Sequence, residues 1–278
     1  MSVKIIVDST VNLTPEAKAQ VKAVPLSVRF GDAEYQDGVT INPEQFYEML
    51  VASEELPTTS QPTPALFEDA FREAVEAGHE VVCITVSSRL SGTYQSATIA
   101  AEEFPGKVFV VDSRTAAIGS GILTEYALQL AAQGMEAEEM LQVLMEKRKQ
   151  IRLYAIVDTL EYLKKGGRLN TAVAIVGGML NIKPIITLED GAIQVAAKAR
   201  GMKAAFSQLT QLCGNHGGVD STMPALLGYT GQSDENLRKY AADNSEIWAA
   251  DTNAAIVGAA IGVHVGPGAV AVAFFSQE

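Results

Sequence analysis

Short apolar runs alternate with longer segments of helical periodicity over the first half of the chain. The apolar runs predict buried strands, and the periodic segments predict the helices between them. The expected strands are residues 3–7, 24–30, 81–86 and 107–111. One helix is expected to start at Pro15 and another to run from the Ser91 turn to about residue 103. The other expected helices are residues 43–53, 65–77, 120–133 and 137–151. Residues 56–64 are expected to form a loop. This alternation is typical of a parallel α/β sheet, which binds ligands at the carboxyl ends of its strands.

The pattern changes after Arg152, where strands follow one another more closely. The expected strands are residues 154–157, 185–188, 192–197, 225–229, 247–249 and 269–275. Gly191 lies in a tight turn between two of them, which predicts a hairpin and antiparallel pairing. We therefore expect an α/β fold of two domains, residues 1–153 with a mostly parallel sheet flanked by helices and residues 154–278 with a mixed or antiparallel sheet and helices. A ligand site is expected between them.

The turn around Ser91 is the most informative segment. Ser91, Gly92 and Thr93 connect a buried strand to a helix start, where free main-chain N–H groups and a partial positive charge favour an anion. The turn itself holds no acid, base or metal ligand, so it is better suited to hold a carboxylate or phosphate than to attack one. The alternative is that the hydroxyls only cap the helix.

Composition narrows the function classes. The net charge of −12 (21 basic and 33 acidic residues) argues against non-specific nucleic-acid binding. Cys83 and Cys213 lie far apart in apolar surroundings, so we expect free buried thiols, no metal site and a reducing cytoplasm. No signal peptide and no apolar run of transmembrane length is visible. His264 stands between valines and ahead of glycines, which fits a core histidine or one that a ligand approaches closely.

Basic residues gather in one window. Residues 147–203 contain eleven Lys or Arg and four Asp or Glu, a net charge of +7 in an acidic protein. This excess indicates a docking surface for an acidic partner or for a nucleotide that a partner holds; the alternative is a solvated helix face with scattered surface charge.

Seven short segments in this order give the chain a family resemblance. They are Ile6-Val7-Asp8-Ser9-Thr10, Thr59-Ser60-Gln61-Pro62, Ser91-Gly92-Thr93, Val111-Asp112-Ser113, Lys165-Gly166-Gly167-Arg168, Lys183-Pro184 and His264-x-Gly-Pro-Gly. Together they resemble the DegV family of bacterial fatty-acid-binding proteins, the lipid-carrier subunit of fatty acid kinase. Two departures are Thr63 and Asn170, at positions where the family often has serine.

The resemblance implies a fatty acid buried between the domains. Its carboxylate would be held by Thr59, Ser91 and His264, with main-chain N–H groups near Gly92 and Thr93. Asp8, Ser9 and Ser60 would form an additional pocket. The tunnel would need small and branched apolar residues, which the chain offers at Ala172, Val173, Ile175, Val176, Met179, Leu180 and Ile182 and over residues 256–263. For each of these taken singly, ordinary core is the favoured interpretation, so none is assigned to the lipid tail.

The resemblance also implies a partner. A separate kinase, which supplies ATP and metal, would phosphorylate the bound long-chain fatty acid, and the acyl phosphate would enter phospholipid synthesis. Arg168 and Arg200 would dock that kinase at the mouth of the lipid pocket, so a charge reversal at Arg168 should abolish turnover and spare lipid binding. The chain itself would have no catalytic residue, cofactor or metal. We expect a cytoplasmic monomer with a transient membrane-surface contact.

Two other functions stay open. The chain could be a free-standing serine hydrolase or acyltransferase that uses Ser91 and His264, with Asp8 or Asp112 orienting the histidine. The absence of a Gly-x-Ser-x-Gly motif disfavours this alternative. It could also carry another apolar acid or a different ligand.

Overall fold

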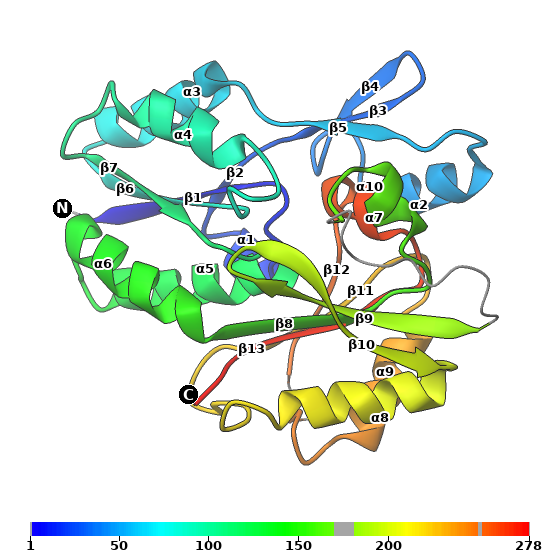
Figure 1. Ribbon diagram of the computed structural model, residues 1–278. Coiled ribbons are helices and arrows are strands. Elements are labelled where there is room, and N and C mark those ends of the chain that lie inside the picture. Colours follow the sequence, from blue (N-terminus) through cyan, green and yellow to red (C-terminus); the bar gives the residue numbers. More distant parts are fainter. Residues whose placement is uncertain (1, 170–180, 250–251, 278) are drawn as a thin grey trace.

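A four-stranded parallel sheet forms the N-terminal part of the protein (Figure 1). Its strands are, in spatial order, β2 (Lys22–Val24), β1 (Val3–Asp8), β6 (Glu80–Thr85) and β7 (Val108–Asp112). Helices α3 (Pro64–Glu76) and α4 (Thr93–Ala101) cover one face, and α5 (Ala117–Ala132) and α6 (Ala137–Lys147) cover the other. The structure, a computed structural model, describes residues 2–169, 181–249 and 252–277.

The second sheet has six strands and mixed directions. In spatial order they are β10 (Ala192–Arg200), β9 (Ile182–Glu189), β8 (Ile151–Ile156), β13 (Val270–Phe275), β11 (Leu226–Tyr229) and β12 (Ala254–Ile256). Only the β11–β12 pair is parallel. Helices α8 (Met202–Cys213) and α9 (Glu235–Asp243) pack against this sheet (Figure 1). The predicted fold class is thereby confirmed, while the division between residues 153 and 154, which falls inside β8, stays a prediction.

A small antiparallel sheet stands beside these two layers. Its order is β4 (Ala33–Gln36), β3 (Ser27–Phe30) and β5 (Thr58–Ser60). Helices α2 (Pro43–Ala52), α7 (Glu161–Lys165) and α10 (Ala259–Val265) gather next to it (Figure 1). The remaining short elements are α1 (Pro15–Lys18) and a 3₁₀ turn (Arg148–Gln150). No helix of the described segments has the length and hydropathy needed to cross a bilayer.

Helix α5 joins the two large sheets. It contacts β1 on one side and β8, β11 and β13 on the other, and its residues are buried around most of its circumference. Gly121 allows the closest approach, because a Cβ there would lie 2.1 Å from the main-chain oxygen of Asn12. The turn after β1 therefore packs directly on α5, close to the carboxyl end of the parallel sheet.

Three sequence expectations were wrong. Residues 24–30 are not one strand, because Pro25 lacks an N–H and the chain passes from β2 in the first sheet to β3 in the third. The expected loop at residues 56–64 contains β5, which pairs with β3. The expected strand at residues 247–249 is a turn whose Trp248 packs on Phe274, and the edge strand β12 follows it.

Candidate functional site

A narrow apolar cavity lies between the carboxyl ends of the parallel strands and the inner face of the second sheet. It has about 880 Å³ of empty space, part of it open to solvent. It is lined by Thr10, Leu26, Thr59, Val86, Leu90, Ser91, Ala116, Ala117, Leu153, Ala155, Leu163, Arg168, Ile186, Leu188, Ile193, Tyr229, Thr230, Val257, Ala260, Ile261, His264, Val265, Ala269 and Ala271. The lining is mainly aliphatic, so the cavity suits an extended apolar group.

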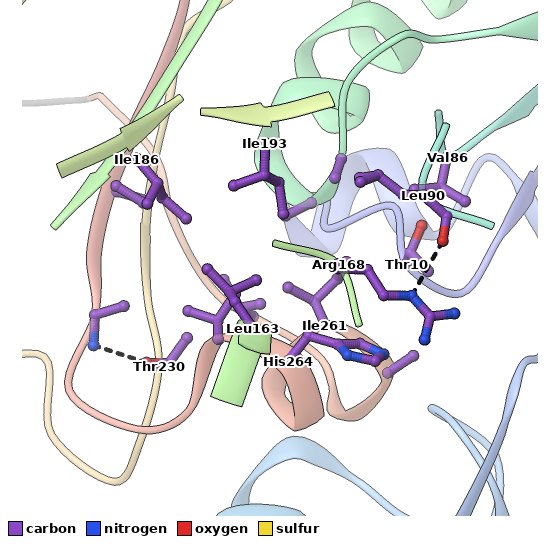
Figure 2. A pocket seen from close by; sticks show the side chains of 18 of the residues that line it. Thr10, Val86, Leu90, Leu163, Arg168, Ile186, Ile193, Thr230, Ile261 and His264 are labelled. Carbon is purple, nitrogen blue, oxygen red and sulfur yellow. Dashed lines mark hydrogen bonds between the residues drawn. The ribbon is translucent and has the colours of Figure 1, made fainter. Parts of the chain in front are cut away.

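Polar side chains lie mainly at one end of this cavity. Figure 2 shows Arg168 and His264 at the end that also carries Leu90 and Thr10, whereas Ile186 and Thr230 lie at the opposite end. The Thr230 hydroxyl accepts a hydrogen bond from the main-chain N–H of Ala269 at 2.8 Å. One end is therefore equipped for a polar head group, and most of the remaining wall is hydrocarbon.

Thr59 and His264 meet at the polar end. Thr59 lies in the middle of β5, and His264 lies in the last turn of α10, not in a loop. The Thr59 Oγ1 and His264 Nε2 atoms are 3.0 Å apart, which is a hydrogen bond. The strand pairing of β5 and the packing of α10 thus bring together two residues that lie 205 positions apart.

His264 is partly buried, and its surroundings disfavour the protonated ring. Burial, and secondarily the charge of Arg168, lower the pKa of His264 to about 4. Its Nδ1 atom has no hydrogen-bond partner. A Cβ on Gly166 would lie 2.2 Å from that atom, so only glycine at this position leaves room for the ring. A ligand carboxylate beside the ring would act against both effects, because a nearby negative charge favours the protonated form of the imidazole.

The Ser91 turn has the predicted strand-to-helix geometry. Ser91 lines the cavity, and its Oγ lies 2.9 Å from Thr93 Oγ1 and accepts from the Thr93 N–H at 3.3 Å. Gly92 precedes α4, and a Cβ there would come within 2.2 Å of Gln61 Oε1. Gly92 and Thr93 are not part of the cavity wall, and Thr93 is fully buried.

Arg168 lies at the polar end of the cavity (Figure 2). It was predicted to dock a partner at the pocket mouth, and in the structure it is part of the cavity wall, where its Nε donates to the main-chain oxygen of Leu90 at 3.2 Å. Its Nη1 donates to the Gly166 carbonyl at 2.7 Å. The signal that could have located it was the pair of glycines before it, which allows a tight return of the chain. Arg200, at the end of β10, is exposed and does not line the cavity.

The other predicted site residues lie elsewhere. Asp8 is fully buried and accepts from the N–H groups of Thr10 (2.8 Å) and Val86 (2.7 Å), so it fixes the turns after β1 and β6. Ser9 lines a separate cavity and accepts from the Leu26 N–H at 3.0 Å. Ser60 is exposed at the end of β5. The structure does not bring these three together in the apolar cavity.

Comparisons with known proteins show which family the chain resembles over its length. A family model described as an uncharacterised protein of the DegV family matches residues 2–277. A DegV domain-containing protein of Deinococcus radiodurans is 38% identical over 279 residues, which cover 98% of each chain. The chain belongs to the DegV family.

Solved DegV structures have the same fold. A DegV family protein of Thermus thermophilus, described by its fatty acid binding, has a TM-score of 0.89 and 33% identity, with 100% of both chains covered. A stearic acid-binding protein of Eubacterium ventriosum has a TM-score of 0.84 and 28% identity, with 99% of this chain and 98% of that chain covered. Both of these solved structures are thus described as binding a fatty acid.

The hydrolase alternative finds no support in this DegV family member. The Ser91 hydroxyl bonds to Thr93, and His264 Nε2 bonds to Thr59. A base that orients serine needs a carboxylate on its other nitrogen, but His264 Nδ1 has no partner. Asp8 bonds to Thr10 and Val86, and Asp112 bonds to Ser88 and Arg114. Neither aspartate orients the histidine.

Part of the predicted tunnel can be located in the DegV fold. Of residues 256–263, Val257, Ala260 and Ile261 line the cavity. The predicted positions from Ala172 to Leu180, and Asn170, lie outside the described residues. Within the described part of the chain, no three His, Cys, Asp or Glu side chains gather as a metal site would require.

Proposed function

We propose that the protein binds a long-chain fatty acid and presents its carboxylate to a separate ATP-dependent kinase. The observation that carries the proposal is the narrow apolar cavity with Thr59, Ser91, Arg168 and His264 in its wall. Structural relatives described as fatty-acid-binding support it. A single anion on a long hydrocarbon tail is the ligand class that matches one polar end and an aliphatic wall.

The tail supplies most of the binding free energy. Burying about fourteen methylenes at roughly 0.8 kcal/mol each gives about 11 kcal/mol before the costs of association. Hydrogen bonds to the charged head contribute about 1.5–3 kcal/mol each. The aliphatic wall therefore sets affinity, and the polar end sets the direction in which the lipid enters.

The head group would be held by Thr59, Ser91 and His264. Both hydroxyls can donate to a carboxylate, and a neutral imidazole can donate from Nε2. The turn at Gly92 and Thr93 stands behind Ser91. Neutral donors leave electron density on the carboxylate oxygens, so they remain nucleophilic. The cation of Arg168 lies close enough to affect His264 and attracts the anion to this end.

The chemical step belongs to the partner. A carboxylate oxygen attacks the terminal phosphorus of ATP, the bond from that phosphorus to the ADP oxygen breaks, and ADP leaves; the product is an acyl phosphate for phospholipid synthesis. ATP and its metal are held by the kinase. Arg168 at the cavity and exposed Arg200 are the docking cations. We place this exchange in the cytoplasm, with the protein as a monomer that touches a membrane surface transiently.

Mass spectrometry of an organic extract tests the proposal. The protein is purified under native conditions, extracted and, in a second sample, delipidated and reloaded with palmitate or oleate. A stoichiometric long-chain fatty acid is expected. An empty extract together with no uptake would overturn the proposal. Labelling of Ser91 by a serine-directed fluorophosphonate would instead restore the hydrolase alternative, since a carrier should not react.

A further inference from the structure

The start of helix α10 is held by side chains that lie far away in the sequence. The Asp37 carboxylate accepts from the N–H of Ala259 through Oδ1 (3.0 Å) and from the N–H of Ala260 through Oδ2 (3.1 Å). In the amide orientation that satisfies its partners, the Asn12 side-chain oxygen accepts from the Gly258 N–H at 3.0 Å. Three successive N–H groups at the start of α10, which no helical carbonyl can satisfy, thus bond to the N-terminal part of the chain.

Asp37 is itself fixed in position. Its main-chain N–H donates to Leu26 at 2.9 Å, and its side chain is 4% exposed. Ser9 hydrogen-bonds to the carboxylate, and the nearby charge of Asp8 opposes ionisation. Burial is the main reason that the pKa of Asp37 is raised to about 6. Burying a carboxylate is energetically unfavourable, and a helix cap on the protein surface does not require it.

The rest of α10 is held mainly by apolar contact. A Cβ on Gly262 would lie 2.5 Å from Phe46 Cε1, so the helix rests directly on an aromatic ring. Apolar contact is non-directional, whereas hydrogen bonds fix position and orientation. The bonds from Asp37 to its first turn are therefore suited to set the position of α10 along its own axis.

The position of α10 matters because it carries cavity residues. Ala260, Ile261 and His264 all line the cavity. Thr59, the partner of His264, lies on β5, which pairs with β3. A shift of α10 by a fraction of a turn would separate His264 from Thr59 without breaking either sheet.

We propose that Asp37 is a positioning residue that sets the place of His264 in the lipid cavity through the first turn of α10. The inference rests on the proposed function, in which His264 holds the fatty-acid carboxylate. Asp37 touches no ligand in this arrangement. Loss of one of its two oxygens as an acceptor would move the imidazole away from the head group.

The test is a double-mutant cycle on palmitate binding. In Asp37→Asn the amide oxygen can accept one N–H, but its NH₂ group faces the other. We expect the Kd for palmitate, measured by calorimetry on delipidated protein, to rise about tenfold in Asp37→Asn. In the His264→Ala background the same change should raise Kd by less than about twofold, because a residue that acts through His264 has nothing left to position. Asp69→Asn, an exposed carboxylate of α3, is the matched control.

A second measurement separates the two proposals. In lipid-free protein, ¹³C NMR should show the His264 pKa rising toward its ordinary value in Asp37→Asn, because the ring leaves its buried place. If wild type binds no palmitate, the proposed function fails and the NMR titration alone judges Asp37. Equal effects in both backgrounds, or an unchanged His264 pKa, would overturn the positioning role. If Asp37→Asn does not fold, Ser9→Ala takes its place in the same cycle. We expect Ser9→Ala to raise the Kd for palmitate about threefold when His264 is present and to leave it unchanged in the His264→Ala background.

Discussion

The hydroxyl of Thr59 lies 3.0 Å from Nε2 of His264, and this bond links the small sheet to α10 at the polar end of the cavity. We expect Thr59→Ala to raise the Kd for a long-chain fatty acid by about tenfold to a hundredfold, since a hydrogen bond to a charged group is lost. Thr58→Ala, on the exposed face of the same strand, is the control. Equal affinities for wild type and Thr59→Ala, measured by calorimetry, would remove Thr59 from the head-group site.

The lowered pKa of His264 makes the free energy of unfolding depend on pH. Because its folded-state pKa of about 4 lies below its ordinary value near 6.5, the unfolded chain binds a proton between these pH values that the folded protein does not. Its contribution is therefore complete above pH 6.5 and is lost as the pH falls toward 4. Relative to wild type, we expect His264→Gln to gain about 2 kcal/mol of unfolding free energy between pH 7.5 and pH 5.

Urea unfolding at the two pH values checks this expectation. The raised pKa of Asp37 acts in the opposite direction, because the folded protein holds that proton more tightly than the unfolded chain and loses stability as the pH rises to about 6. Asp37 is present in both proteins, so its effect largely cancels in the difference. A difference between variant and wild type that does not change with pH would contradict the lowered pKa of His264.

The absence of a side chain at Gly92 leaves room for Gln61 beside the Ser91 turn. The Gln61 Nε2 donates to Ser96 Oγ at 3.0 Å, and a Cβ at position 92 would lie 2.2 Å from Gln61 Oε1. We expect Gly92→Ala to weaken fatty-acid binding about fivefold or more, because Gln61 or the turn must move. The double variant Gly92→Ala/Gln61→Ala should recover most of the affinity. A double variant as weak as the single one would show that the clash is not the cause.

Ser87 ties the β9–β10 hairpin to the turn after β6. Its Oγ donates to the Gly191 carbonyl at 2.8 Å, and the side chain is fully buried. We expect Ser87→Ala to lower the unfolding free energy by about 1–3 kcal/mol, because a buried carbonyl loses its donor. Urea denaturation measures it, with exposed Ser207→Ala of α8 as the control. A loss no larger than in the control would mean that the hairpin does not depend on this bond.

Charge reversal at the two proposed docking arginines should have different effects on fatty-acid binding. Arg200 is exposed and away from the cavity, so Arg200→Glu should leave fatty-acid affinity unchanged and lower kinase-dependent acyl phosphate formation at least about tenfold. Arg168 lines the cavity, so Arg168→Glu places an anion beside the proposed carboxylate site. We therefore expect it to weaken lipid binding as well as turnover, and not to spare lipid binding as the sequence alone suggested. If turnover with Arg200→Glu equals that of wild type, Arg200 is not a docking residue.

Local patterns in the sequence were sufficient for most of the fold. Apolar runs located β1, β6 and β7, and Gly191 marked the hairpin of β9 and β10. The same reasoning failed for residues 24–30, since apolar character does not say which sheet a strand joins. It also failed for residues 247–249, where Trp248 is buried by packing on Phe274 without being in a strand.

The sequence by itself determined the chemistry that is available, namely the Ser91 turn after a buried strand and a histidine between valines and ahead of glycines. Only the tertiary structure decided which groups meet. The Thr59–His264 bond, the entry of Arg168 into the cavity and the hold of Asp37 on α10 join positions that are 205, 78 and 222 residues apart. Such contacts depend on sheet order and helix packing, which involve the whole chain, whereas turn and helix signals arise from neighbouring residues.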